Sequence, residues 1–102
     1  MDMTTVIAGL SALAHPSRLA VFRALVSAGE QGLQPSALAD TLGIAANTLS
    51  FHLKSLKAAA LVTRERQGRA QLYRVDFGHT QALIDFLTHD CCGGKACKVR
   101  RP

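Results

Sequence analysis

Three cysteines lie close together near the end of this chain, and its other positions contain none. They are Cys91, Cys92 and Cys97, with Gly93 and Gly94 directly after the second. Cysteines that serve packing are usually spread among core positions, whereas clustered thiols can hold one soft electrophile together. The cluster therefore indicates a site for a soft metal or metalloid, and the elements before it decide what such a site would control.

Length and composition limit the class of protein. A chain of 102 residues forms one domain with a modest core, which dimerisation would help to stabilise. No stretch approaches the ~20 apolar residues of a membrane span, and the first residues lack the features of a secretory signal. We therefore expect a cytoplasmic protein without a membrane partner, in a reducing compartment where a disulfide framework is not favoured. The net charge of +5 suits a polyanionic partner.

Apolar periodicity predicts four helices before residue 62. The dipeptide His15-Pro16 separates the first two, and Gly43 ends the third. The predicted helices cover residues 4–14, 16–29, 35–42 and 45–61. The side chains expected to face the core include Val6, Ile7, Leu10 and Leu13 in the first helix and Leu19, Phe22, Leu25 and Val26 in the second.

The fourth predicted helix has two unlike faces. Its apolar stripe consists of Leu49, Leu53, Leu56 and Ala60. The other face carries short hydrogen-bonding and cationic groups, namely Asn47, Thr48, Ser50, His52, Lys54, Ser55 and Lys57. Such a composition favours a surface that contacts another molecule. Ala45 and Ala46 offer no side-chain cap, so Asn47 is the alternative capping residue.

The sequence after this helix predicts a strand at 62–66, a turn at Gly68, a strand at 70–75 and a last helix at 79–90. The hairpin carries four guanidinium groups, on Arg64, Arg66, Arg69 and Arg74. The whole order is ααααββα, mainly α with a small β-hairpin. Two helices joined by a tight turn and followed by a basic hairpin are typical of a winged helix-turn-helix.

Four stretches carry a family resemblance. They are Ala-His-Pro-Ser-Arg-Leu at 14–19, Leu-Ala-Asp-Thr-Leu-Gly at 38–43, Thr-Leu-Ser-Phe-His-Leu-Lys-Ser-Leu at 48–56 and Ala-Leu-Val at 60–62. With them the chain resembles the ArsR/SmtB family of metal-responsive winged-helix repressors. The resemblance implies a DNA-binding, non-enzymatic protein. It also implies a homodimer joined through the first and last helices, with the fourth helix as recognition helix in the major groove of double-stranded operator DNA.

The residue types on this surface suit DNA. Ser50 and His52 are short enough to reach base edges, and Asn47 can present a bidentate amide to adenine. Lys54 and Lys57, together with the hairpin arginines, would mainly bind phosphates, and such contacts make affinity fall steeply with salt. The predicted DNA-binding residues are Asn47, Thr48, Ser50, His52, Lys54, Lys57, Arg64, Arg66 and Arg69, and Arg69 is the best placed to enter the minor groove.

The cysteine run resembles the subgroup of arsenic-responsive repressors that bind trivalent arsenic at the end of the last helix. Trivalent arsenic prefers sulfur and is three-coordinate and pyramidal, so Cys91, Cys92 and Cys97 would saturate it, and antimony could take its place. We therefore expect a winged helix-turn-helix domain at 1–92 and a basic tail at 93–102 that completes the inducer site. The paired cysteines that many metalloid-responsive relatives carry in the third helix are absent from residues 32–38.

Three other interpretations stay open, namely a zinc or cadmium site, a redox switch and adventitious metal binding. Zinc-responsive relatives place Asp and His ligands along the last helix, and Asp76, His79, His89 and Asp90 match that pattern with a slip of one residue. Structural zinc or cadmium would want four ligands, of which His89 could be the fourth beside the three thiols. Neighbouring thiols could also serve as a redox switch, or a basic tail could bind metals adventitiously.

Overall fold

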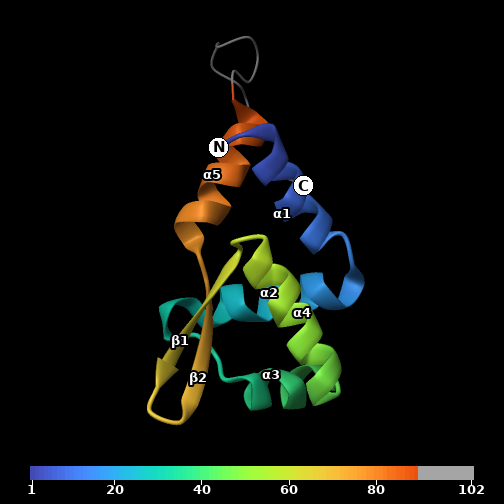
Figure 1. Cartoon of the computed structure of the whole chain (residues 1–102), viewed down its shortest axis with the longest axis vertical. Helices are drawn as coiled ribbons and strands as arrows, with labels where there is room; N and C mark the ends of the chain where they lie inside the picture. Colours follow the sequence, from blue (N-terminus) through green and yellow to red (C-terminus); the bar gives the residue numbers. More distant parts are fainter. Residues whose placement is uncertain (90–102) are drawn as a thin grey trace.

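The computed structural model describes residues 1–89. Its elements are α1 (Met3–Leu13), α2 (Pro16–Ala28), the 3₁₀ turn η1 (Gly29–Gln31), α3 (Pro35–Leu42), α4 (Ala46–Ala58), β1 (Val62–Gln67), β2 (Ala70–Val75) and α5 (Phe77–Thr88). This order confirms the predicted winged helix-turn-helix fold. Figure 1 shows α1 and α5 together at one end, with α2, α3, α4 and the hairpin at the other.

The core lies among α2, α3, α4 and the base of the hairpin. Its fully buried large side chains are Val21, Leu25, Leu38, Leu49, Leu53, Leu56, Leu61 and Val62. Gly43 makes the turn between α3 and α4 with φ of 64° and ψ of 35°, and its N–H donates to the carbonyl of Ala39. Glycine adopts this left-handed conformation without steric cost, which explains why the third helix ends where the sequence predicts.

The hairpin is antiparallel, with Val62 opposite Val75 and Gln67 opposite Ala70. Gly68 at the turn has a φ of 62°. The base of the hairpin is fixed to the segment before α3, because Leu33 and Tyr73 exchange two backbone hydrogen bonds of 2.9 Å. The wing is therefore held against the helix-turn-helix by its backbone.

The apolar stripes of α1 and α2 are buried only in part, because Val6, Phe22 and Leu25 face the core as predicted and four other predicted core residues do not. Ile7 and Leu10 are 56% and 41% exposed, and Leu19 and Val26 are 44% and 37% exposed. The residues that α1 buries are Val6, Gly9 and Ala12, and α2 buries Val21, Phe22 and Leu25. Small residues let α1 approach its neighbours closely, so its larger side chains remain at the surface.

Two helix boundaries also differ from the prediction. The last helix begins at Phe77 rather than at His79, because the Asp76 carboxylate caps it by accepting from the His79 N–H at 2.9 Å. The fourth helix ends at Ala58, and Ala60 has a φ of 63°. Ala59, which is 9% exposed, takes the buried place that was predicted for Ala60.

Candidate nucleic-acid interface

One face of α4 is polar and positively charged. Its exposed residues include Asn47, Thr48, Ser50, Lys54 and Lys57. The opposite face holds Leu49, Leu53 and Leu56, which are at most 1% exposed and anchor the helix in the core. Because α4 contains no acidic residue, the field along its outer face is positive.

The prediction that His52 lies on this outer face is wrong. The side chain is 5% exposed and faces inward, where its ring centroid lies 5.0 Å from that of His15. His52 follows Leu49 by three residues and precedes Leu56 by four, so helical spacing places it on the buried stripe. His52 therefore positions α4 against the turn between α1 and α2 and does not face outward with the other predicted DNA-binding residues.

The surroundings of His52 favour its neutral form. Burial lowers the pKa of the imidazole, and the electrostatic interactions with His15 and Arg18 act in the same direction. The Nδ1 atom of His52 has no hydrogen-bond partner among the described residues. His15 is fixed from its other side, because its Nδ1 accepts from the N–H groups of Ser17 and Arg18 at 3.1 and 3.4 Å and so caps α2.

Asn47 does not cap α4. The helix begins at Ala46, and the preceding residue, Ala45, supplies no side-chain cap. The Asn47 Oδ1 instead accepts from the neighbouring Thr48 N–H at 2.9 Å. An amide oxygen has two lone pairs, so Oδ1 can keep this hydrogen bond while the exposed amide makes a bidentate contact with adenine.

Phe51 was missed by the sequence reasoning, although it lies on the outer face of α4. It is 61% exposed. Its ring stands edge-on to the ring of His52, with centroids 6.0 Å apart and an interplanar angle of 66°. The signal that could have found it is its spacing of four residues from Asn47 and three from Lys54, which puts all three on one stripe.

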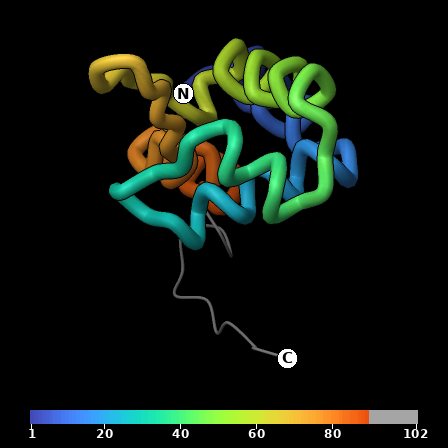
Figure 2. Tube along the Cα trace, turned by 90° about the horizontal axis from the view of Figure 1, so that it is seen from below, coloured from blue at the N-terminus to red at the C-terminus, as the bar shows by residue number. Residues whose placement is uncertain are grey.

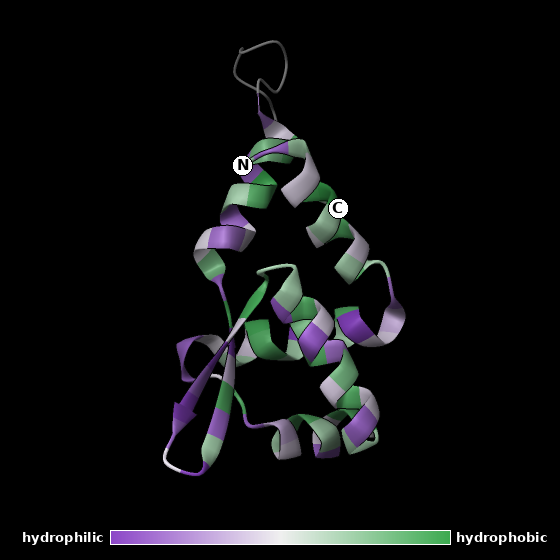
Figure 3. Ribbon diagram, in the orientation of Figure 1, coloured by the Kyte–Doolittle hydropathy of each residue, from purple (hydrophilic) through white to green (hydrophobic). Residues whose placement is uncertain are grey.

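Three of the four arginines on the wing are exposed, and one of them, Arg66, donates from Nε to the carbonyl of Gly68 at 3.4 Å. Arg64, Arg66 and Arg69 are exposed, whereas the Nη2 atom of Arg74 lies 3.0 Å from the carboxylate of Glu65. Figure 3 shows most of β1 as hydrophilic, whereas β2 has hydrophobic and hydrophilic segments. Seen from below, the hairpin and α4 lie toward the same side of the molecule (Figure 2). The two basic elements can therefore contact one polyanion together.

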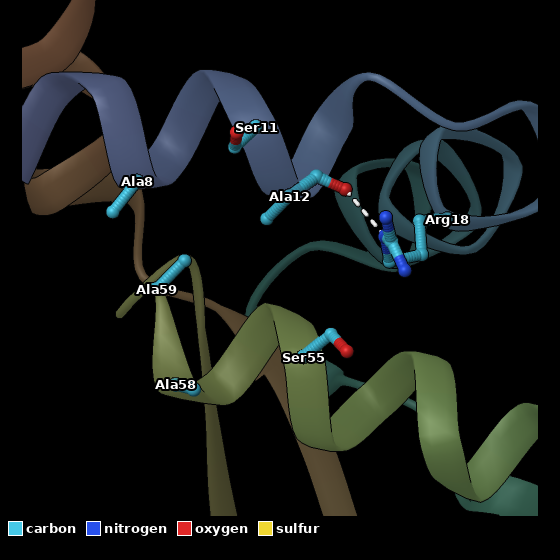
Figure 4. A pocket seen from close by; sticks show the side chains of 7 residues that line it. All are labelled: Ala8, Ser11, Ala12, Arg18, Ser55, Ala58 and Ala59. Carbon is cyan, nitrogen blue, oxygen red and sulfur yellow. Dashed lines mark hydrogen bonds between the residues drawn. The ribbon is translucent and has the colours of Figure 1, made fainter.

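A shallow hollow of ≈ 430 Å³ lies between α1 and α4 (Figure 4). Its lining consists of Ala8, Ser11, Ala12, Arg18, Ser55, Ala58 and Ala59. The Arg18 Nε donates to the carbonyl of Ala12 at 2.8 Å and so joins the end of α1 to the start of α2. The hollow offers two serine hydroxyls and one guanidinium, and none of its lining residues carries a carboxylate, imidazole or thiol that could act as a general base for a hydroxyl.

The predicted metal ligands fall mostly outside the described part of the chain. Cys91, Cys92, Cys97 and Asp90 lie beyond residue 89. Within residues 1–89 no three His, Cys, Asp or Glu side chains come together as a metal site. Asp76, one of the four residues of the alternative zinc site on the last helix, uses its carboxylate to cap α5.

No single helix in this described part is long and apolar enough to cross a membrane, and only the pair of α1 with residues 16–31, bent by 100°, passes that test together.

Comparison with known sequences agrees with the fold. Residues 13–65, which are half of the chain, match the family described as a helix-turn-helix domain. The chain is 38% identical over 81 residues to the HTH-type transcriptional repressor SmtB of Mycobacterium tuberculosis, in strains CDC 1551 / Oshkosh and H37Rv. That alignment covers 78% of this chain and 58% of the relative, so the chain spans less than two thirds of the relative's length.

Solved structures with the same fold include an ArsR-like transcriptional regulator from Rhodococcus sp. RHA1, with a TM-score of 0.78 and 22% identity over 89% of this chain and 83% of that one. Another is the homodimeric winged helix-turn-helix DNA-binding domain Mb0332 from Mycobacterium bovis, a possible ArsR-family regulator. Its TM-score is 0.67, with 25% identity over 95% of this chain and 90% of that one. The chain therefore belongs to the helix-turn-helix domain family, and within it to the winged regulators of the ArsR/SmtB type.

Proposed function

We propose that this protein is a cytoplasmic, arsenic(III)-responsive transcriptional repressor that binds operator DNA as a homodimer and leaves it when trivalent arsenic or antimony binds Cys91, Cys92 and Cys97. The observation that carries the DNA-binding half is the cationic outer face of α4 beside a wing with three exposed arginines. In this proposal α4 enters the major groove, and the wing contacts phosphates and the minor groove.

Exposed apolar side chains support a dimer through α1 and α5. Met3, Ile7 and Leu10 of α1 and Ile84 and Leu87 of α5 are between 41% and 62% exposed. A second copy that covers these residues would remove their apolar surface from water and enlarge the small core. The Mycobacterium bovis domain with this fold is homodimeric, which favours the same assembly here. Two α4 helices related by the dimer axis would then lie ~34 Å apart, one turn of DNA.

The chemistry of the thiols supports arsenic as inducer. Arsenous acid carries three hydroxyl groups, and each cysteine thiol that forms an As–S bond replaces one of them and releases one water. Three thiols therefore convert the acid to a trithiolate with no change of oxidation state and no open position. Two glycines, the residue type with the fewest backbone restrictions, stand between Cys92 and Cys97 in the sequence. Lys95 and Lys98 favour the thiolate form of the neighbouring cysteines by their charge.

Titration of an operator complex with arsenite tests the proposal. Wild-type protein selects its operator from a randomised duplex library, and fluorescence anisotropy follows the complex as arsenite, zinc or peroxide is added. We expect arsenite to release the wild type, and Cys91→Ser, Cys92→Ser or Cys97→Ser to abolish that release while leaving DNA affinity unchanged.

The other inducers give different outcomes. His89→Ala is the matched control, because an arsenic site of three sulfurs does not need it and a four-ligand zinc site does. X-ray absorption at the bound element counts the ligands directly. If zinc bound by four ligands, or peroxide alone, released the protein from its operator, that agent would replace arsenic as the proposed inducer. A variant without all three thiols that still left the operator on addition of arsenite would end the proposal.

A further inference from the structure

Phe51 is the only large apolar side chain that α4 exposes. The other exposed ones lie on α1, α2 and α5 or at the N-terminus. A single exposed phenylalanine is ordinary on most surfaces. Here, however, its neighbours on the same stripe are Asn47 and Lys54, and the face carries no acidic group, so this is the face proposed to enter the major groove.

The Phe51 ring has the buried ring of His52 as its neighbour. The rings of Phe51 and His52 have centroids 6.0 Å apart and an interplanar angle of 66°, and His52 is itself buried beside His15. The backing ring therefore belongs to the fixed interior rather than to a mobile surface chain. Phe51 therefore has this buried ring beside it, while the residue itself is 61% exposed and open to a ligand.

The major groove offers one apolar group on its base edges, the C5-methyl of thymine. A phenyl ring has no donor or acceptor for the remaining base-edge atoms, so burying it against them would leave those atoms unpaired. Burying it against the methyl removes apolar surface of both partners from water. Lys54, three residues further along α4, can hold a phosphate of the adjacent backbone and so fix how deeply the ring enters.

We infer that Phe51 determines operator specificity by packing on the C5-methyl of a thymine in each half-site. This inference rests on the proposed DNA-binding function and adds one base preference to it. It also replaces the base-edge role that the sequence suggested for the neighbouring His52 with a contact of a different chemistry.

Deoxyuridine provides the test, because it removes only the methyl group from a thymine. Each thymine of the selected operator is replaced in turn, and dissociation constants of the full chain are measured by anisotropy at one fixed salt concentration. For the wild type we expect one or two replacements per half-site to weaken binding about four-fold, the effect of one buried methyl group. For Phe51→Ala we expect the same replacements to change affinity by less than about 1.5-fold.

Phe77→Ala is the matched control, since Phe77 is 42% exposed at the start of α5 rather than on α4. It should retain the four-fold sensitivity. Circular dichroism checks that both variants fold. A wild type indifferent to every replacement, or a Phe51→Ala protein that keeps the wild-type sensitivity, would overturn the inference while leaving DNA binding intact. Failure to select any duplex would overturn the proposed function itself.

Discussion

Replacement of the buried His52 by leucine should remove part of the acid sensitivity of the protein. Burial lowers the pKa of His52 in the folded state below the ordinary value of 6.5. As the pH falls, the unfolded chain therefore takes up a proton at this residue before the folded chain does. The stabilisation due to the neutral imidazole is complete above about pH 6.5 and is lost progressively below it, until the folded-state pKa is reached.

The size of this effect has an upper limit. If His52 stays neutral in the fold, one group with an unfolded pKa of 6.5 lowers the free energy of unfolding by about 1.4 kcal/mol at about pH 5.5 and by almost nothing at about pH 7.5. Urea denaturation at these two pH values, at one protomer concentration, measures the loss. We expect the loss to be smaller in His52→Leu by up to this amount.

The comparison needs a histidine that is not buried. His89→Leu removes an exposed one and serves as the comparison variant. The reasoning is wrong if His52→Leu and the wild type lose equal stability between the two pH values. A gain in stability of His52→Leu at neutral pH would not contradict it, because the variant also removes a buried Nδ1 without a hydrogen-bond partner.

Three further substitutions test other parts of the fold and interface. Ala60→Gly should raise the free energy of unfolding by up to ~1 kcal/mol, measured by urea denaturation, because Ala60 has a left-handed φ of 63°. Leu38→Ala should lower it by ~2–5 kcal/mol, since this side chain is fully buried in α3 and leaves a cavity. Arg69→Ala should reduce the slope of log affinity against log salt by about 1 per protomer and leave the circular dichroism spectrum unchanged, and an unaltered slope would mean that Arg69 contacts no phosphate.

The order of elements could be predicted because local chemistry marks their ends. Pro16 begins α2, Gly43 ends α3 and Gly68 makes the hairpin turn, and each of these residues acts through its own backbone conformation. The basic residues of α4 and the wing were also predictable, because charged side chains remain exposed unless a partner covers them. Only Arg74 proved to be paired, with Glu65 on the adjacent strand.

The orientation of each helix could not be predicted as well. Periodicity identifies an apolar stripe but does not say whether the same chain or a second copy covers it, which is why Ile7 and Leu10 were expected inside. For His52 the information was present in its spacing from Leu49 and Leu56, but its polar character suggested the surface. Phe51 was not considered at all, because its apolar character gave no indication of the outer face on which it lies.

The attachment of α5 to its own chain bears on how an inducer could act. Its first turn is fixed by the Asp76 cap and by the Asp76 N–H, which donates to the carbonyl of Leu61 at 3.0 Å. Its one buried side chain is Leu83, which lies so close to Gly9 of α1 that an added Cβ there would be 2.7 Å from Leu83 Cδ1. Ile84 and Leu87 remain exposed beyond this contact.

The last turns of α5 are therefore oriented mainly by whatever covers these two side chains, which in the proposed dimer is the partner subunit. The proposed thiol site follows directly after these turns in the sequence. A ligand ordered there would act on an element that its own chain restrains weakly, so little of its binding energy would be spent on breaking internal packing. In the proposed mechanism, each ~1.4 kcal/mol of coupling between the thiol site and the dimer interface would change operator affinity ten-fold, so a few kcal/mol would be sufficient for derepression.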